Sequence, residues 1–235
     1  MCGRYKFYRS DKWAIAKKFG VRIEDIPDYA DEIDNAPGSW RSAIQIENDE
    51  RMWTGMRWGF DMTIQGKTKT VFNTKVEGVM ESKLWKPRFV KNRCIIPATG
   101  FIEWKKVDGK RVPGAPKFDI TVTDQECFGF AGLWGTWTNP KTRLVEKTFS
   151  IFTTDPNEMF AEYHNRQPVI LEPGEFEEWL APSERPPAHL LRIFPAEKMV
   201  VTQVENPTPM KAVKAKAANP EKEPLAAVTG SLFPE

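Results

Sequence analysis

Residues 93–104 read RCIIPATGFIEW, and residues 128–134 read FGFAGLW. Both stretches are short, largely apolar and rich in aromatic or β-branched side chains, which is the pattern of buried strands. Turn-forming residues separate strand-like segments at 108–110 (DGK) and 139–141 (NPK). We therefore expect strands over residues 93–97, 101–107, 117–122, 128–134 and 147–154.

The flanking segments add short helices and further strands. Asp11 offers an N-cap for a helix that Gly20 would end. Trp13, Ala16 and Phe19 share one face of that helix. Many short strands with few helices predict an α+β protein with a mainly antiparallel, barrel-like sheet core and peripheral short helices. The remaining expected elements are strands over residues 43–47, 52–58 and 198–204, and helices over residues 77–85 and 173–180.

Length and composition predict one folded unit followed by a tail. The chain of 235 residues is long enough for a full hydrophobic core in a single β-rich domain. Pro, Ala, Lys and Glu dominate its last part, so we expect one domain over residues 1–205 and a disordered tail over residues 206–235. No apolar run is long enough to cross a bilayer, and Arg4 and Lys6 interrupt the N-terminal segment where a secretory signal would be apolar.

The three cysteines, Cys2, Cys94 and Cys127, are widely spaced and include no CxxC pair. This spacing argues against a disulfide framework and against a zinc site, and it fits a reducing cytoplasm. Cys94 and Cys127 lie in apolar runs, where we expect them to be buried. No glycine-rich nucleotide-binding motif is present. We therefore expect no metal, no nucleotide and no other cofactor.

The charge distribution leaves two interpretations open. A formal net charge of +2 is too small to indicate a nucleic-acid-binding protein by itself. The basic residues nevertheless crowd one stretch of the chain. A basic face could bind phosphate, although an ordinary solvated surface explains the same pattern. The crowded residues are Lys67, Lys69, Lys75, Lys83, Lys86, Arg88, Lys91 and Arg93.

Cys2 is the most reactive feature of the sequence. A small side chain after the initiator Met normally permits removal of Met1, which leaves an α-amine and a thiol on one residue. With reference pKa values of about 8 and about 8.5, fractions of both groups are nucleophilic near neutral pH. The amine can form a Schiff base with an aldehyde, after which the thiol closes a thiazolidine. Toward an amide or ester, Cys2 would be an N-terminal nucleophile with its own amine as base.

Three polar side chains adjoin apolar strand-like segments. Glu103 either faces solvent by strand alternation or points into a partly buried pocket, where burial would raise its pKa. His164 directly precedes an apolar strand, where a side chain can face a cleft, and a surface position is the alternative. Asn73 follows an apolar segment, and its amide could orient a substrate without titrating.

The chain resembles the SRAP family, the SOS-response-associated peptidases or abasic-site-processing proteins. No single motif is decisive, but an ordered set of seven covers about residues 2–171 and is specific. The set comprises MCGRY (1–5), APG (36–38), WGF (58–60), NTKVE (73–77), GFIEW (100–104), AGLW (131–134) and HNRQPVIL (164–171).

The resemblance implies an enzyme of DNA repair that binds single-stranded DNA and captures the ring-opened aldehyde of an abasic site. Cys2 would be the nucleophile, and removal of Met1 would precede a thiazolidine crosslink. Asn73 and His164 match the family's substrate-positioning residues, and Glu103 matches its acid/base carboxylate. The resemblance places the DNA contacts at Gly3, Arg4, Lys75, Glu77 and Arg166, to which we add Trp40 as a ring that could stack on a base.

Several positions depart from the family pattern. Lys75 stands where the family usually has Arg, which keeps the charge but loses a planar bidentate phosphate contact. The family's customary Tyr-Asn-x-Ala-Pro reads Ile-Asp-Asn-Ala-Pro at residues 33–37, so a polar contact there is lost or altered. The segment after residues 58–60 is short and lacks an aromatic or proline wedge. These departures concern strand-junction preference more than covalent chemistry.

Two other functions fit the same residues. One is an N-terminal-nucleophile cysteine peptidase or amidohydrolase, whose activity could include release of its own Met1. A lyase-type activity is a further catalytic possibility for the same enzyme. The other is a noncovalent single-stranded DNA-binding module in which Cys2 is incidental, since many chains begin Met-Cys by chance. We expect a monomer with single-stranded DNA as its partner and no membrane partner.

Overall fold

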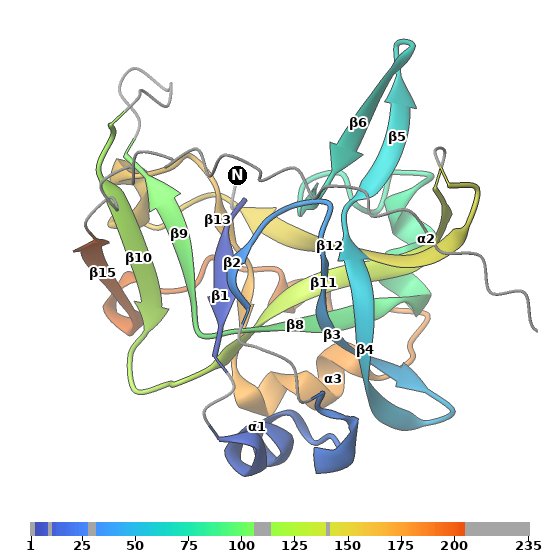
Figure 1. Cartoon of the computed structure of the whole chain (residues 1–235), viewed down its shortest axis with the longest axis horizontal. Helices are drawn as coiled ribbons and strands as arrows, with labels where there is room; N and C mark the ends of the chain where they lie inside the picture. The colour runs from blue at the N-terminus through green and yellow to red at the C-terminus, as the bar shows by residue number, and fades with distance from the viewer. Residues whose placement is uncertain (1–2, 9–10, 28–31, 106–113, 140–141, 205–235) are drawn as a thin grey trace, which may run out of the picture.

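In this computed structural model, residues 3–8, 11–27, 32–105, 114–139 and 142–204 are described. Cys2 and the expected tail over residues 206–235 lie outside the described residues. The described chain forms sheets with short helices at the periphery, so the expected fold class is confirmed (Figure 1). No described helix has the length and hydropathy needed to span a membrane.

Five strands close into a ring. Antiparallel pairs join β3 to β4, β3 to β8, β8 to β11 and β11 to β12. The ring is completed by a parallel contact between β4 and β12, at the pairs Arg57↔Thr148 and Trp58↔Phe149. The barrel-like core expected from the sequence is therefore a closed barrel. Its strands are β3 (Trp40–Glu47), β4 (Glu50–Trp58), β8 (Arg93–Ala98), β11 (Phe128–Thr138) and β12 (Val145–Thr154).

Both faces of the barrel strands are covered by protein. Along β8, Ile95 belongs to the cluster that packs against α1, α2 and α3, whereas Cys94 and Ile96 belong to a second cluster that includes Tyr5 and Phe101. Every residue of β8 is buried. Because neither face of this strand meets solvent, its sequence has no alternation of apolar and polar residues and is largely apolar. The expected burial of Cys94 and Cys127 is confirmed.

A second sheet packs beside the barrel, in the strand order β15-β10-β9-β1-β2. Its strands are antiparallel, and β1 is an internal strand between β9 and β2. Thr99 alone separates β8 from β9, so the chain passes directly from the barrel into the second sheet. The bounds are β1 (Tyr5–Phe7), β2 (Glu32–Asn35), β9 (Gly100–Trp104), β10 (Lys117–Val122) and β15 (Met199–Val204).

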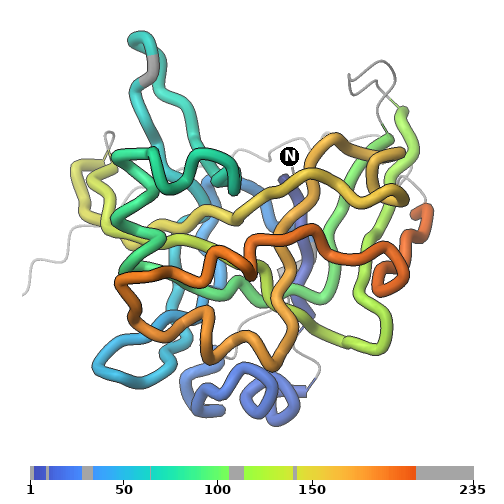
Figure 2. The backbone as a smooth tube through the Cα atoms, turned by 180° about the vertical axis from the view of Figure 1, so that it is seen from behind, coloured from blue at the N-terminus to red at the C-terminus, as the bar shows by residue number. Residues whose placement is uncertain are grey.

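A two-stranded hairpin, β5 (Phe60–Ile64) and β6 (Lys67–Val71), projects from the body. Figures 1 and 2 show it at the end of the molecule where β1 begins. No strand is expected here from the sequence, so the hairpin is an addition to the predicted elements. Three very short strands complete the sheets: β7 (Asn73–Lys75) and β13 (Gln167–Pro168) pair with β12, and β14 (Ile170–Leu171) pairs with β11.

The first helix, α1 (Lys12–Phe19), has the expected ends. The Asp11 side chain accepts a hydrogen bond from the backbone N–H of Ala14, and Gly20 adopts the left-handed conformation with φ of 64°. The predicted face is partly wrong, because the Trp13 side chain is 74% exposed. Ile15 is buried in its place, together with Ala16 and Phe19.

The helix expected over residues 77–85 is also wrong. Residues 78–82 form a turn, and the helix α2 (Trp85–Lys91) begins later and contains Pro87 in its first turn. A proline is tolerated there because first-turn N–H groups have no partner within the helix. The helix expected over residues 173–180 is confirmed as the 3-10 turn η3 (Pro173–Glu175) followed by α3 (Phe176–Leu180). Further 3-10 turns are η1 (Ile23–Asp25), η2 (Phe160–Glu162), η4 (Ala188–Leu190) and η5 (Ala196–Lys198).

Candidate functional site

The described start of the chain runs along β9. Tyr5 pairs with Phe101, and the Ile102 N–H donates to the Arg4 carbonyl oxygen at 2.9 Å. This hydrogen bond holds Arg4 beside Ile102, the residue that precedes Glu103 in β9. The Arg4 side chain is partly exposed and forms an ion pair with Asp34, with 3.1 Å between Nε and Oδ1.

Glu103 is buried, with 6% of its surface exposed. Along β9, Phe101 and Glu103 alternate onto the buried face, whereas Ile102 and Trp104 lie on the half-exposed face. Of the two positions that the sequence left open for Glu103, the buried one is correct. The carboxylate therefore shares a face with the aromatic core residue Phe101.

His164 is also buried, at 4% exposure, so the alternative of a surface histidine is wrong. Its Nδ1 accepts a hydrogen bond from the backbone N–H of Arg166 at 2.9 Å. Because Nδ1 acts as acceptor, the neutral imidazole carries its proton on Nε2. The His164 backbone N–H bonds to the carbonyl oxygen of Phe160, which fixes the histidine at the end of η2.

An aromatic contact connects the surroundings of Glu103 and His164. Phe118 of β10 pairs with Glu103 across the second sheet. The Phe118 ring lies 4.6 Å, between centroids, from the ring of Tyr163, the neighbour of His164 in the chain. The structure thus brings the segment of His164 against the strand pair that carries Glu103.

Asn73, the first residue of β7, is 8% exposed. It pairs with Ile151 of β12, and its neighbour Phe72 accepts a hydrogen bond from the Trp58 indole N–H at 2.9 Å. The Trp58 ring in turn contacts the Tyr5 ring edge-to-face at 5.1 Å. Packed aromatic rings therefore connect the segment of Asn73 to the first strand of the chain.

The Arg166 side chain is bound within the protein. Its guanidinium donates to both carboxylate oxygens of Glu77, at 2.8 and 2.7 Å, and to Asp155 at 2.7 Å. It also donates to the Thr153 carbonyl oxygen at 2.6 Å. The hydrogen bond from Arg166 is the main cause that lowers the pKa of Glu77, and the charge of Lys75 adds to it.

Asp155 is the member of this group that sequence reasoning missed as a site residue. It directly follows Thr154, the last residue of β12, and the sequence signal was its position after an apolar strand. The structure therefore joins His164, Arg166, Glu77 and Asp155 through a continuous set of hydrogen bonds and ion pairs.

Two predicted DNA-contacting residues point outward. Lys75 at the end of β7 is exposed. Trp40 at the start of β3 is 52% exposed, and its partner across the β3–β4 pair is Arg57. Both side chains are therefore accessible to a ligand at the surface.

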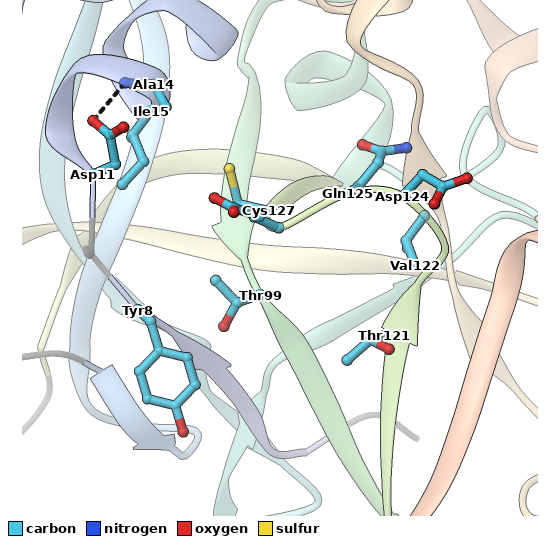
Figure 3. A pocket seen from close by; sticks show the side chains of 11 residues that line it. Tyr8, Asp11, Ala14, Ile15, Thr99, Thr121, Val122, Asp124, Gln125 and Cys127 are labelled. Atoms are coloured by element: carbon cyan, nitrogen blue, oxygen red, sulfur yellow. Dashed lines mark hydrogen bonds between the residues drawn. The ribbon is translucent and has the colours of Figure 1, made fainter.

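A cavity of about 710 Å³ lies away from these residues. Tyr8, Thr99, Thr121 and Cys127 are among its lining residues, at the ends of β9 and β10 remote from Glu103 (Figure 3). A smaller cavity of about 310 Å³ is lined by Glu77, with Val76, Met80 and Leu191. Among the described residues, no group of three or more His, Cys, Asp or Glu side chains is arranged to hold a metal ion.

Comparison with known proteins points to one family. Residues 1–208 match the model of the family described as SOS response associated peptidase (SRAP). The chain is 31% identical over 218 residues to the abasic site processing protein YoqW of Bacillus subtilis, covering 88% of this chain and 93% of that protein. It is 28% identical over 204 residues to the abasic site processing protein HMCES of Gallus gallus, covering 72% of this chain and 60% of that protein.

The fold is also similar to that of a solved structure. A crystal structure of a protein from Bacteroides thetaiotaomicron superposes with a TM-score of 0.72 at 26% sequence identity. The superposition covers 87% of this chain and 93% of that one. The closed barrel and its adjoining sheet are therefore shared with a protein of known structure.

Proposed function

Because the chain belongs to the SOS response associated peptidase (SRAP) family, we propose that it processes abasic sites in DNA by covalent capture through Cys2. Relatives such as YoqW and HMCES are named abasic site processing proteins, which supports this substrate. The observation that best supports the proposal is the hydrogen bond from the Ile102 N–H to the Arg4 carbonyl oxygen, because it holds the chain two residues after Cys2 beside the strand that carries the buried Glu103.

The proposed reaction begins with the ring-opened sugar of an abasic site. The α-amine of Cys2 attacks the C1′ carbonyl carbon, and the carbinolamine loses water to give a Schiff base. The Cys2 thiolate then adds to the same carbon, the nitrogen takes up a proton, and a thiazolidine closes. The sum is one aldehyde plus one aminothiol, giving one ring and one water.

The buried side chains take complementary roles in this proposal. Glu103 transfers protons as the hemiacetal opens and as water leaves. His164, with its proton on Nε2, donates a hydrogen bond to the sugar oxygen, because the Arg166 N–H already occupies Nδ1. Asn73 holds the sugar in near-attack geometry, where orientation can lower a barrier by about 7–11 kcal/mol.

We assign the DNA contacts to predicted residues whose side chains are exposed to solvent. Arg4 and Lys75 present partly or fully exposed cations to the phosphate backbone, and Trp40 offers a ring on which a base can stack. Arg166 is 11% exposed and is held by carboxylates. We therefore give Arg166 and Glu77 a positioning role for the segment of His164 at the DNA-binding face.

Intact-mass spectrometry with an abasic single-stranded oligonucleotide tests the proposal. The purified protein should lack Met1, and incubation should add the mass of the oligonucleotide less one water. Cys2→Ala should abolish the heat-stable adduct and keep noncovalent DNA binding, whereas Cys127→Ala, which removes a buried thiol, should form the adduct. A full adduct yield from Cys2→Ala, or retention of Met1 in active protein, would refute the assignment.

The peptidase alternative predicts a different outcome. An N-terminal-nucleophile amidohydrolase would cleave a peptide or ester without any covalent DNA species. A noncovalent DNA-binding module would show salt-sensitive binding and an unchanged protein mass. The mass experiment therefore separates covalent capture from the other two functions, and assays of peptide cleavage and of salt-sensitive DNA binding separate those two from each other.

A further inference from the structure

The β5–β6 hairpin has a firmly held base. Phe60 is fully buried, and its ring contacts the rings of Trp85 and Trp137 at 5.3 and 5.8 Å. The Asp61 carboxylate accepts hydrogen bonds from Arg57 at 2.9 Å and from the Thr70 hydroxyl at 2.6 Å. The base of the hairpin is therefore fixed on the barrel.

The outer part of the hairpin is exposed and basic. Met62 pairs with Lys69, and both lysines of β6, Lys67 and Lys69, are exposed. Alternation puts Lys67 and Lys69 on the same face as Phe60, the face that looks toward Trp85 at the start of α2.

Two further exposed lysines, Lys83 and Lys86, flank Trp85 in the chain. We call these four residues, Lys67, Lys69, Lys83 and Lys86, the hairpin basic surface. Among the residues that the structure describes, none of the four takes part in an ion pair. No neighbouring carboxylate that the structure describes is paired with these charges, so all four lysines can attract a polyanion electrostatically.

The hairpin is continuous with the candidate site. Strand β6 ends at Val71, and Asn73 follows two residues later as the first residue of β7. In both backbone views, the hairpin projects at the end where β1 begins, and α1 lies at the opposite end (Figures 1 and 2). A strand of DNA that enters the site at Asn73 would therefore pass beside the hairpin.

We propose that the hairpin basic surface binds the phosphate backbone of the DNA strand that flanks the damaged nucleotide. Lys67 and Lys69 lie about 7 Å apart along β6, so they can meet separate phosphates. The proposal rests on the proposed function, since it assumes DNA in the site. The hairpin serves here as an arm that extends the bound length of the strand and selects longer substrates.

The test uses undamaged single-stranded oligonucleotides of about 20 and about 5 nucleotides, which bracket ordinary site sizes. The variant is K67E/K69E. The matched control is K17E/R185E, which makes the same charge change at exposed residues on α1 and after α3. Dissociation constants are measured over a range of salt concentrations, without any chemistry at Cys2.

We expect the affinity for the long oligonucleotide to fall more than the affinity for the short one. K67E/K69E should weaken its binding on the order of tenfold at moderate salt, and reduce the slope of log K against log salt by about 1.4, the share of two phosphate contacts. The ratio of long to short affinity should fall in this variant and stay at the wild-type value in K17E/R185E. The neutral variant K67Q/K69Q should also lose affinity for the long oligonucleotide, but by a smaller factor than K67E/K69E.

Three outcomes would overturn the proposal: wild-type affinity in both hairpin variants, an equal loss in the control, or no DNA binding by the wild type. If the wild type binds DNA and the hairpin variants lose the long-strand advantage, but no abasic adduct forms, the hairpin proposal stands and covalent capture fails. A hairpin that instead contacts an acidic protein would leave both dissociation constants unchanged.

Discussion

Among single residues, Arg166 shows how the fold changes the role of a side chain. A conformationally free arginine would be suited to phosphate, yet here Glu77, Asp155 and the Thr153 carbonyl oxygen receive its hydrogen bonds. Its backbone N–H meanwhile fixes the tautomer of His164. One residue thus ties the end of β12, the segment after β7 and the histidine into a single unit.

Replacing Glu103 by Gln should slow capture, because an amide has the shape of the carboxylate but exchanges no proton. A loss of about 10²- to 10⁴-fold in the rate of adduct formation is expected for a general acid/base. Denaturing gels of timed reactions with an abasic oligonucleotide provide the measurement. Glu162→Gln, at an exposed carboxylate near His164, is the control and should react at the wild-type rate. Unchanged forward and reverse rates in Glu103→Gln would remove Glu103 from the mechanism.

The Glu77–Arg166 ion pair should give stability a small dependence on pH. The pKa of Glu77 is lowered from its ordinary value of 4.5, chiefly by the hydrogen bond from Arg166. A lowered folded-state pKa contributes stability that is present above about 4.5 and is lost as pH falls through the folded-state value. Because the Glu77 side chain is 52% exposed, solvent screening limits this contribution to about 0.5 kcal/mol.

Urea denaturation at a series of pH values provides the measurement. Glu77→Gln should be less stable than wild type near neutrality, and the gap should close in acid. Glu81→Gln, at an exposed carboxylate in the following turn, should keep the wild-type pH dependence. Identical pH profiles for Glu77→Gln and wild type would show that the ion pair adds nothing to stability.

At the scale of elements, the projecting hairpin depends on Gly59 at its base. Gly59 has φ of +107°, and a Cβ there would lie 2.5 Å from Cγ2 of Thr70 and 3.2 Å from Cβ of Phe72. Neither the backbone conformation nor the space suits a side chain. The glycine thus allows β6 to return closely over the end of β4 before the chain enters β7.

Gly59→Ala should therefore destabilise the protein by about 1–3 kcal/mol, the usual cost of overpacking combined with backbone strain. Chemical denaturation measures the loss. Gly55→Ala is the control, because a Cβ at Gly55 meets nothing within 4 Å and its φ is ordinary. Equal stabilities of the two variants would show that the hairpin base is not constrained as described.

Local signals in the sequence predicted some elements and missed others for identifiable reasons. Asp11 and Gly20 marked the ends of α1 because capping chemistry is local. The hairpin is absent from the predicted elements because β6, with its exposed lysines and threonines, has no apolar alternation, although Phe60, Met62 and Ile64 do alternate with polar residues along β5. The predicted helix over residues 77–85 ends before Pro87 because proline stops a helix when it lies in the interior, whereas α2 accommodates this proline in its first turn.

The same limits apply to the site. The sequence singled out Asn73, Glu103 and His164, and the structure buries all three. The burial of Glu103 does not follow from strand alternation alone, because apolar residues stand on both faces of β9, with Phe101 on one and Ile102 and Trp104 on the other. The roles of these residues in capture stay predictions, and Cys2 lies outside the described residues.

At the scale of the whole molecule, closure of the barrel rests on a non-local contact. Residues 57–58 of β4 meet residues 148–149 of β12 in parallel, although 91 positions separate the paired residues in the sequence. Strand existence follows from local patterns, but such a pairing depends on how the intervening strands are arranged. The sequence therefore indicated a barrel-like sheet without specifying which strands close it.

The internal position of β1 has a consequence for biosynthesis. Since β1 lies between β2 and β9, its second neighbour does not exist until residues 100–104 have left the ribosome. Until then the nascent chain lacks the strand that pairs with β1 on that side, so the removal of Met1 that the proposed function requires can precede completion of the sheet. A fusion at the amino end would block the proposed nucleophile and extend β1, so purification tags for this protein should be placed at the carboxyl terminus.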